Sequence, residues 1–299
     1  MKRIVLAIVL VALFAVPAMA QNVDVTFSGD IFGAYADDTE AFQLYSFIDR
    51  EYSNLSVNAK VGDNLAFTYR VGLDDFVSMF GINSPYTREA YVSLLNVAPA
   101  ISEVRVGEFT FPFAAQQWIG YHKGLMFLPS SATGNGVMVS GSFAPVSYNL
   151  AVTNSFDSQN LPVLFGSGEK PVWAKVSSDL GVVNAGLSYV KEDDVSVWGL
   201  NAAFDAGIVG LTAEYLTLQN TGSDDVNLGF VGANVPVTGP LSVFGKYYYV
   251  NVVGSSSNAF AFGADYAISE NAKIRVENMS DEDGIWAGDI LEAQLRVSF

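Results

Sequence analysis

The sequence predicts an all-β fold, a 16-stranded antiparallel transmembrane β-barrel, and three observations lead to this prediction. Apolar and polar residues alternate with period two along most of the chain after residue 20, which places one set of side chains on each face of a strand. The alternating segments are about 9–12 residues long, the length with which a tilted strand crosses a bilayer. Their number is even, so both ends of the barrel domain lie on the same side of the membrane.

The alternation is clearest in segments 65–74, 209–216 and 291–299, and no segment carries a sustained helical stripe. The short links between segments are rich in Gly, Asn and Pro, which favour turns, and we expect them to be periplasmic. The long links, expected to be extracellular, are 37–51, 77–85, 110–133 and 156–170. The expected strands are 23–36, 52–61, 65–76, 86–95, 101–109, 134–143, 146–155, 171–179, 182–190, 194–205, 208–218, 225–234, 241–251, 258–267, 272–280 and 289–299.

The composition supports a membrane protein that crosses with strands. Half of the residues are hydrophobic and 15% are charged, against about 25% charged in an ordinary soluble protein. After residue 20 no stretch of 18 apolar residues occurs, so no transmembrane helix is predicted. The formal net charge of −16 excludes nonspecific binding of nucleic acid, because phosphates repel an acidic protein. The absence of cysteine excludes disulfides, thiol catalysis and cysteine metal sites.

Residues 1–20 have the pattern of a secretory signal peptide. Basic residues Lys2 and Arg3 precede an apolar run of 13 residues, Ile4 to Val16, and an A-x-A cleavage pattern ends at Ala20. The run is shorter than the ~20 residues that span a bilayer. We therefore expect cleavage after Ala20 and a barrel domain over residues 21–299, with an uncleaved membrane anchor as the alternative.

The charged positions of the alternating strands are predicted to face enclosed water. An Arg or Lys on the lipid face costs about 2–4 kcal/mol near the bilayer midplane, whereas sixteen strands leave an aqueous interior. Opposed charges could set up a transverse field, but for any single residue we expect a solvated charge beside a paired neighbour. The residues predicted to line the interior are Arg70, Asp74, Glu89, Glu103, Arg105, Lys175, Glu214, Lys246, Asp265, Lys273, Arg275, Glu277, Glu292 and Arg296.

Acidic residues cluster at the expected outer tips, and an acidic rim attracts cations, so we expect a weak cation preference. The tip residues are Asp37, Asp38, Glu40, Asp49, Glu51, Glu192, Asp193, Asp194, Asp224, Asp225, Asp281, Glu282 and Asp283. Aromatic residues near strand ends are expected to form girdles at the membrane interfaces. They are Tyr35, Tyr69, Tyr148, Trp173, Tyr189, Trp198, Tyr215, Tyr247, Tyr249 and Trp286.

The link 110–133 is too aromatic for a simply solvated loop. Folded inside the barrel, its aromatic side chains would pack on the wall and its polar side chains would meet the lumen. The alternative is an outer loop that contacts neighbouring barrels or lipid headgroups. The residues predicted to narrow the lumen are Glu108 at the root of the loop, Gln117, His122 and Lys123.

Catalytic and cofactor-binding patterns are missing from the sequence. His122 is the single histidine, and no nucleophile motif accompanies it. No P-loop, dinucleotide fingerprint or zinc spacing occurs, and Asp281-Glu282-Asp283 matches no calcium-loop pattern. We therefore expect neither an enzyme nor a bound metal or cofactor.

The C-terminal residues Leu295-Arg296-Val297-Ser298-Phe299 resemble the terminal signature of bacterial outer-membrane barrels. In these proteins a terminal Phe, with apolar residues at alternate positions before it, is recognised by the barrel-assembly machinery. The resemblance implies that Phe299 is an assembly signal, that periplasmic chaperones escort the chain, and that it resides among the lipids of the outer membrane.

A second resemblance covers residues 88–154. Residues 88–94, REAYVSL, are similar to the R-x-A-Y-V-G-L strand of porins, and residues 104–113, VRVGEFTFPF, to the V-x-V-G-x-F-x-x-P-F stretch that follows it, notably in relatives of phosphate-selective porins. Residues 135–141 resemble the strand after the constriction loop. The resemblance implies that loop 110–133 folds into the lumen. Phosphate-selective porins line their pores with many basic residues, whereas this chain has 15 in all, which argues against phosphate selectivity.

The resemblance to the 16-stranded porins implies a channel for passive diffusion of small hydrophilic solutes and ions. Porins of this size are often homotrimers, so the resemblance also implies a trimer. The alternatives are an adhesive or structural surface protein with the barrel as its anchor, and an enzyme. Most expected outer loops are short, which argues against a large adhesive surface.

Overall fold

The computed structural model describes residues 23–36, 41–43, 53–72, 86–113, 133–154, 170–220, 223–252, 255–281 and 289–299. The expected signal peptide and most of loop 110–133 lie outside these residues, so both predictions stay predictions. No helix among the described residues is long and apolar enough to cross a membrane.

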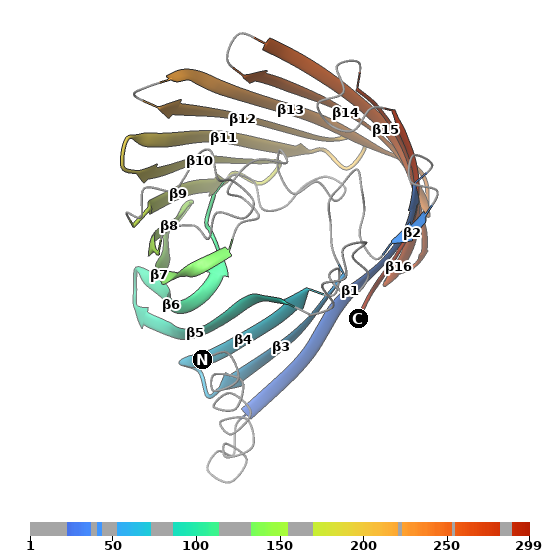
Figure 1. The fold of residues 1–299 in the computed structure, drawn as a ribbon. Coiled ribbons are helices and arrows are strands. Elements are labelled where there is room, and N and C mark those ends of the chain that lie inside the picture. The colour runs from blue at the N-terminus through green and yellow to red at the C-terminus, as the bar shows by residue number, and fades with distance from the viewer. Residues whose placement is uncertain are drawn as a thin grey trace.

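The described chain forms one antiparallel sheet in which strands pair with their neighbours in chain order (Figure 1). The first strand, β1, also pairs with the last, β17, from Asp30 opposite Ser298 to Ala36 opposite Glu292, so the sheet closes into a barrel. The strands are β1 (Val23–Ala36), β2 (Ala41–Gln43), β3 (Asn54–Val61), β4 (Leu65–Gly72), β5 (Tyr86–Ala98), β6 (Ile101–Thr110), β7 (Thr133–Phe143), β8 (Val146–Thr153), β9 (Val172–Asp179), β10 (Val183–Glu192), β11 (Val195–Asp205), β12 (Gly210–Asn220), β13 (Ser223–Thr238), β14 (Leu241–Val252), β15 (Ser255–Ser269), β16 (Ala272–Asp281) and β17 (Ile290–Ser298).

The barrel has sixteen strand positions, as the sequence predicts, because β2 and β3 share one of them. Residues Ala41–Gln43 of β2 pair with the end of β1 near Ala36, and β3 pairs with the rest of β1, up to Asp30. The main difference from the expected strands is β13, which runs past Pro236 to Thr238. Its ladder with β14 continues because the register shifts between Pro236 and Thr238, and this irregularity accommodates the missing proline N–H.

Contacts that reach over an intervening strand identify the inner face of the barrel. Lys246 Nζ of β14 lies 2.7 Å from Glu277 Oε1 of β16, although β15 runs between these strands. Side chains converge inside a cylinder and diverge outside it, so this pair lies on the concave face. Successive side chains alternate between faces, and therefore neighbours such as Val276, which is exposed, point outward.

The outer face is apolar and carries tyrosine–asparagine pairs. Near the middle of β12 and β14, Tyr215 Oη donates to Asn227 Oδ1 at 2.8 Å and Tyr247 Oη donates to Asn258 Oδ1 at 2.6 Å. Tyrosines are typical of the boundary between hydrocarbon and water, where the ring stays apolar and the hydroxyl finds a polar partner. Exposed apolar side chains on the same face include Val176, Leu187, Leu200, Val231, Val243, Phe262, Ile274 and Leu295.

The seam between β1 and β17 is closed by side chains as well as by the ladder. Asp30 Oδ1 accepts hydrogen bonds from Arg296 Nε and Nη2, at 3.0 and 2.8 Å, and from Ser298 Oγ at 2.6 Å. The backbones of Gly29 and Phe299 exchange two hydrogen bonds of 2.9 and 3.0 Å. A Cβ on Gly29 would lie 3.0 Å from Cζ of the Phe299 ring, so the glycine leaves room for this ring against β1.

We predict that Asp30→Ala weakens closure of the barrel. The change removes the acceptor of three hydrogen bonds, and because the pair is partly exposed the loss should be about 1–2 kcal/mol of unfolding free energy. Urea unfolding in lipid vesicles measures the loss of unfolding free energy. The temperature at which the folded form loses its distinct electrophoretic mobility gives a second measure of stability. Lys60→Ala is the control, since Lys60 and Asp63 are 3.9 Å apart and largely exposed. Equal stability of the two variants would contradict the role of the seam.

Candidate functional site

The inner wall of β14, β15 and β16 carries a compact network of charged side chains. Arg275 makes a bidentate pair with Asp265, with Nε to Oδ1 at 2.6 Å and Nη2 to Oδ2 at 2.7 Å. Lys273 lies 3.5 Å from the same carboxylate. Arg275 Nη1 is 3.8 Å from Glu277, which also pairs with Lys246 at 2.7 Å. Five of the residues predicted to line the interior are thus brought together on one side of the barrel.

An aromatic ring lies between the two cations of this network. Phe244 of β14 has Lys246 Nζ 4.6 Å and Arg275 Cζ 4.4 Å from its ring centroid. The ring reaches toward β16 over Gly263 of β15, where a Cβ would lie 2.6 Å from the Phe244 ring and 2.4 Å from a backbone oxygen. The glycine therefore makes the cation–π contacts possible, and these contacts stabilise two buried charges that have little water around them.

Like charges face each other between β16 and β17. Glu277 is opposite Glu292, and Lys273 is opposite Arg296. Such pairs are destabilising unless each member has its own counterion. Glu277 has Lys246, Lys273 has Asp265, and Arg296 has Asp30. Three of these four facing charges therefore belong to local ion pairs.

A second charged group lies across β4, β5 and β6. Arg70 Nη1 is 3.0 Å from Glu89 Oε2, and Arg70 Nε donates to Ser56 Oγ at 3.0 Å. The other oxygen of Glu89 accepts from the backbone N–H and the hydroxyl of Thr110, at 3.1 and 2.7 Å. Glu89 is buried while the Arg70 side chain is 40% exposed. The pair thus links the wall to the end of β6.

Two further predicted residues pair within β6 itself. Arg105 Nε and Nη2 donate to Glu103 at 3.1 and 3.0 Å, and the guanidinium lies 4.2 Å from the centre of the Tyr91 ring. The Ser93 hydroxyl donates to the same carboxylate. Farther along the sheet, Glu214 of β12 lies close enough to Lys175 of β9 to attract it electrostatically. Asp74 lies outside the described residues.

The inner face of β9 to β14 corrects one expectation, because part of it is apolar. The simple alternation assigns apolar residues to the lipid face, yet here both faces carry them. Trp173 was expected in an outer girdle; instead it is fully buried on the inner face and donates from Nε1 to Thr153 Oγ1 at 2.9 Å. The inner apolar sector also contains Val190, Val197, Leu216, Leu218, Leu228, Phe230, Tyr248 and Val250.

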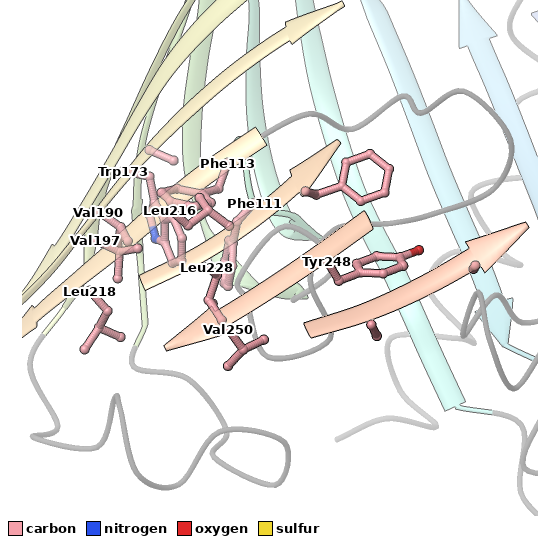
Figure 2. Packing of buried hydrophobic residues seen from close by; sticks show 14 of the residues in the cluster. Phe111, Phe113, Trp173, Val190, Val197, Leu216, Leu218, Leu228, Tyr248 and Val250 are labelled. Atoms are coloured by element: carbon pink, nitrogen blue, oxygen red, sulfur yellow. The ribbon is translucent and has the colours of Figure 1, made fainter. Parts of the chain in front are cut away.

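The chain leaving β6 packs on this inner apolar sector. Figure 2 shows Phe111 and Phe113 beside Trp173 and Leu216. The Phe111 ring stacks on Trp173 at 4.3 Å, and Phe113 meets it edge-on at 6.2 Å. Trp173 belongs to β9, two strands beyond β7, so residues 111–113 pass along the concave side to reach it. They are the described part of the link for which inward folding was predicted.

The predicted narrowing residues fall into two groups. Glu108 is not a loop residue, because it lies in the β6 ladder opposite Ala90 and Asn135. Arg105 and Gly107 lie on the inner face of β6, and successive side chains alternate between faces. Glu108 therefore points outward, as Val106 does. The expected strand 101–109 already contained Glu108, and the ladder continues one residue further, to Thr110. Gln117, His122 and Lys123 lie outside the described residues.

Two carboxylates on the inner wall were missed or misplaced by sequence reasoning. Asp30 alternates with Gly29 and Ile31 in β1, a signal that could have added it to the predicted lining. Glu192 was assigned to an acidic outer tip, but it is the last residue of β10 and is 2% exposed. Only Asp193 and Asp194 form the exposed turn there. Among the described residues, no group of three or more His, Cys, Asp or Glu could hold a metal ion.

A comparison with family models decides the class of this barrel. The model described as Gram-negative porin matches residues 7–284. The chain belongs to the Gram-negative porin family. This porin is therefore an outer-membrane channel for passive diffusion rather than an enzyme. A comparison with curated proteins found no match.

Solved porin structures share the fold of this porin at low sequence identity. An anion-selective porin from Comamonas acidovorans is 17% identical with a TM-score of 0.70, over 93% of this chain and 100% of that one. The outer-membrane channel DcaP of Acinetobacter baumannii is 12% identical with a TM-score of 0.67, over 93% and 98%. The trimer form of OmpT from Vibrio cholerae is 13% identical with a TM-score of 0.64, over 93% and 100%.

We predict that Glu277→Ala destabilises this porin by about 3–5 kcal/mol, because it removes one partner of a buried ion pair. The double variant Lys246→Met with Glu277→Leu should lose less, since an apolar pair of similar volume avoids an uncompensated charge. Urea unfolding of Lys246→Met, Glu277→Leu and the double variant gives the coupling energy. Additive effects, with no coupling, would mean that the 2.7 Å contact contributes nothing.

We also predict that Trp173→Ala loses about 3–5 kcal/mol, the usual cost of removing a buried aromatic side chain. Trp173→Phe is the matched control, because it retains a ring against Phe111 while losing the hydrogen bond to Thr153. The same unfolding measurement applies. If the two variants lose equally, the hydrogen bond rather than the ring stack stabilises the inner apolar sector.

Proposed function

We propose that this porin lets small hydrophilic solutes and ions diffuse through a water-filled lumen lined by the predicted wall residues. The observation that carries the proposal is that charged side chains of membrane-spanning strands stay partly exposed on the concave face. Arg70 is 40% exposed, Arg296 is 23% exposed and Asp30 is 27% exposed. Partly exposed charges are stable there only beside water, since hydrocarbon would cost several kcal/mol.

We further propose that link 110–133 narrows the lumen on the side of β9 to β12. The packing of Phe111 and Phe113 on the inner apolar sector supports this, because it directs the chain into the barrel. Gln117, His122 and Lys123 would then meet the passing solute. Glu108 is not part of this proposal, since it lies in the β6 ladder.

A weak preference for cations is proposed from the overall charge. The wall charges largely neutralise one another in ion pairs, so they contribute little net field. The formal net charge of −16 then makes the electrostatic potential at the ends of the channel negative, and a negative potential attracts cations. Described acidic residues at the outer tips include Asp193, Asp194 and Asp225.

The remaining proposals concern assembly. Cleavage after Ala20 follows from the signal pattern, and Phe299 is proposed as the residue read by the barrel-assembly machinery after delivery by periplasmic chaperones. A homotrimer is proposed because a structurally similar protein, OmpT of Vibrio cholerae, has a trimer form.

Planar-bilayer recordings test the proposed function. We expect steady single-channel current steps. Under a salt gradient, we expect a reversal potential whose sign indicates selectivity for cations. Asp193→Asn with Asp194→Asn should move the reversal potential toward zero, and asparagine tolerates the positive φ of 50° at position 193. Arg70→Gln should move it the other way. Absence of conductance from folded protein would refute the water-filled lumen, and anion selectivity would refute the cation preference alone.

A further inference from the structure

Two neighbouring turns lie at the end of the barrel that carries the short links. Both expose large apolar side chains, and both hydrogen-bond backbone N–H groups within the turn. The first joins β9 to β10 through Leu180, Gly181 and Val182, and the second joins β11 to β12 through residues 206–209. Short links of outer-membrane barrels face the periplasm. We propose that these two turns are immersed in the periplasmic leaflet and that their partner is the lipid at the acyl–headgroup boundary.

The first observation is the exposure of bulky aliphatic residues at the turn tips. Ile208 is 77% exposed, Leu180 is 64% exposed and Val182 is 57% exposed. Turns in water are normally built from small and polar residues. The short link between β3 and β4, Gly62-Asp63-Asn64, has that composition in this chain. Exposed apolar residues also flank other short links, such as Phe143 at 65% and Ile268 at 54%, but those lie within strands, whereas Leu180, Val182 and Ile208 lie in the turns themselves. Water is an unfavourable neighbour for such turn residues.

The second observation is that the two turns satisfy their backbone groups internally by the same device. Asp179 Oδ1 accepts from Gly181 N at 2.9 Å, and Asp205 Oδ1 accepts from Gly207 N at 2.7 Å. Leu180 N donates to Val183 O at 2.8 Å. A turn that enters an apolar environment must pair its N–H groups within the protein. Both turns meet this requirement. A turn in water has no such requirement, because water can pair with its N–H groups.

The third observation is the height of the wall at this place. Strands β8 and β9 have 8 residues each, against 16 in β13 and 15 in β15. A tilted strand needs about 9–11 residues to cross the hydrocarbon. Strand β9 therefore brings the turn that follows it up to the membrane boundary rather than beyond it. Strands β3 and β4 also have 8 residues each, so the turn between them differs from this one in its polar composition and not in its height.

The outer face above these turns continues the same apolar surface. A shallow groove crosses β9 to β12, with Ala185, Ala202 and Ala213 among its lining residues, and Leu187 and Leu200 beside them. The turn tips thus extend the surface that already meets lipid. The carboxylates of Asp179 and Asp205 limit the depth, because charged groups are tolerated near the interface but not at the midplane. Both observations point to the boundary region of the leaflet.

Site-directed fluorescence tests the proposal, and the absence of cysteine allows single labels. Ile208→Cys and Leu180→Cys, each carrying an environment-sensitive fluorophore, are compared with Asp63→Cys in the polar turn. The full protein is refolded into vesicles containing brominated phosphatidylcholine or surrounded by aqueous iodide. We expect several-fold stronger quenching by the brominated lipid than by iodide at positions 208 and 180, and the reverse at position 63.

Strong iodide quenching at positions 208 and 180, equal to that at position 63, would overturn the proposal. Shielding from both quenchers would also overturn it, because the turns would then be covered by protein, such as a second copy of this chain. If one labelled variant fails to fold, the other and Val182→Cys report on the same turns. The test does not depend on the proposed solute or on selectivity, since the quenching is independent of conductance.

Discussion

Every strand of this protein depends on the pairing of its backbone N–H and C=O groups, because lipid offers these groups no partner. Sixteen strand positions meet the requirement only if the sheet closes, and closure rests on β1 and β17. Asp30 and Arg296, held together by charge-assisted hydrogen bonds, stand at this junction. The same constraint explains why Asp179 and Asp205 close their turns internally.

The inner wall combines two solutions to the problem of side chains inside a barrel. On β14 to β17 the charges form local ion pairs, and Phe244 separates two cations above Gly263. On β9 to β12 part of the wall is apolar, and this part receives Phe111 and Phe113. A polar sector suits hydrated solutes, whereas an apolar sector suits packed protein. The two sectors therefore divide the interior between a permeation surface and a docking surface for the chain itself.

Most of the fold could be predicted from the sequence, and the inner wall only in part. Period-two alternation located the strands closely, as in 23–36 for β1, because one face meets lipid along the whole ladder. The charged alternates Arg275 and Glu277 were found by the same rule. It failed for Trp173, since inward positions that pack against protein are as apolar as outward ones. Glu192 was misplaced because a strand end and an acidic tip look alike in sequence.

Pairing in chain order has a consequence for how the polypeptide is threaded. All pairings except β1 with β17 join segments that are close in sequence, so each hairpin can form locally and only one contact spans the chain. The position of the two ends is then arbitrary for the architecture. A circularly permuted chain, opened at a short turn and with Phe299 joined to Val23 by a linker long enough to run past residues 23–28 of β1, would retain every ladder. Only the location of the terminal Phe distinguishes the natural order from its permutations.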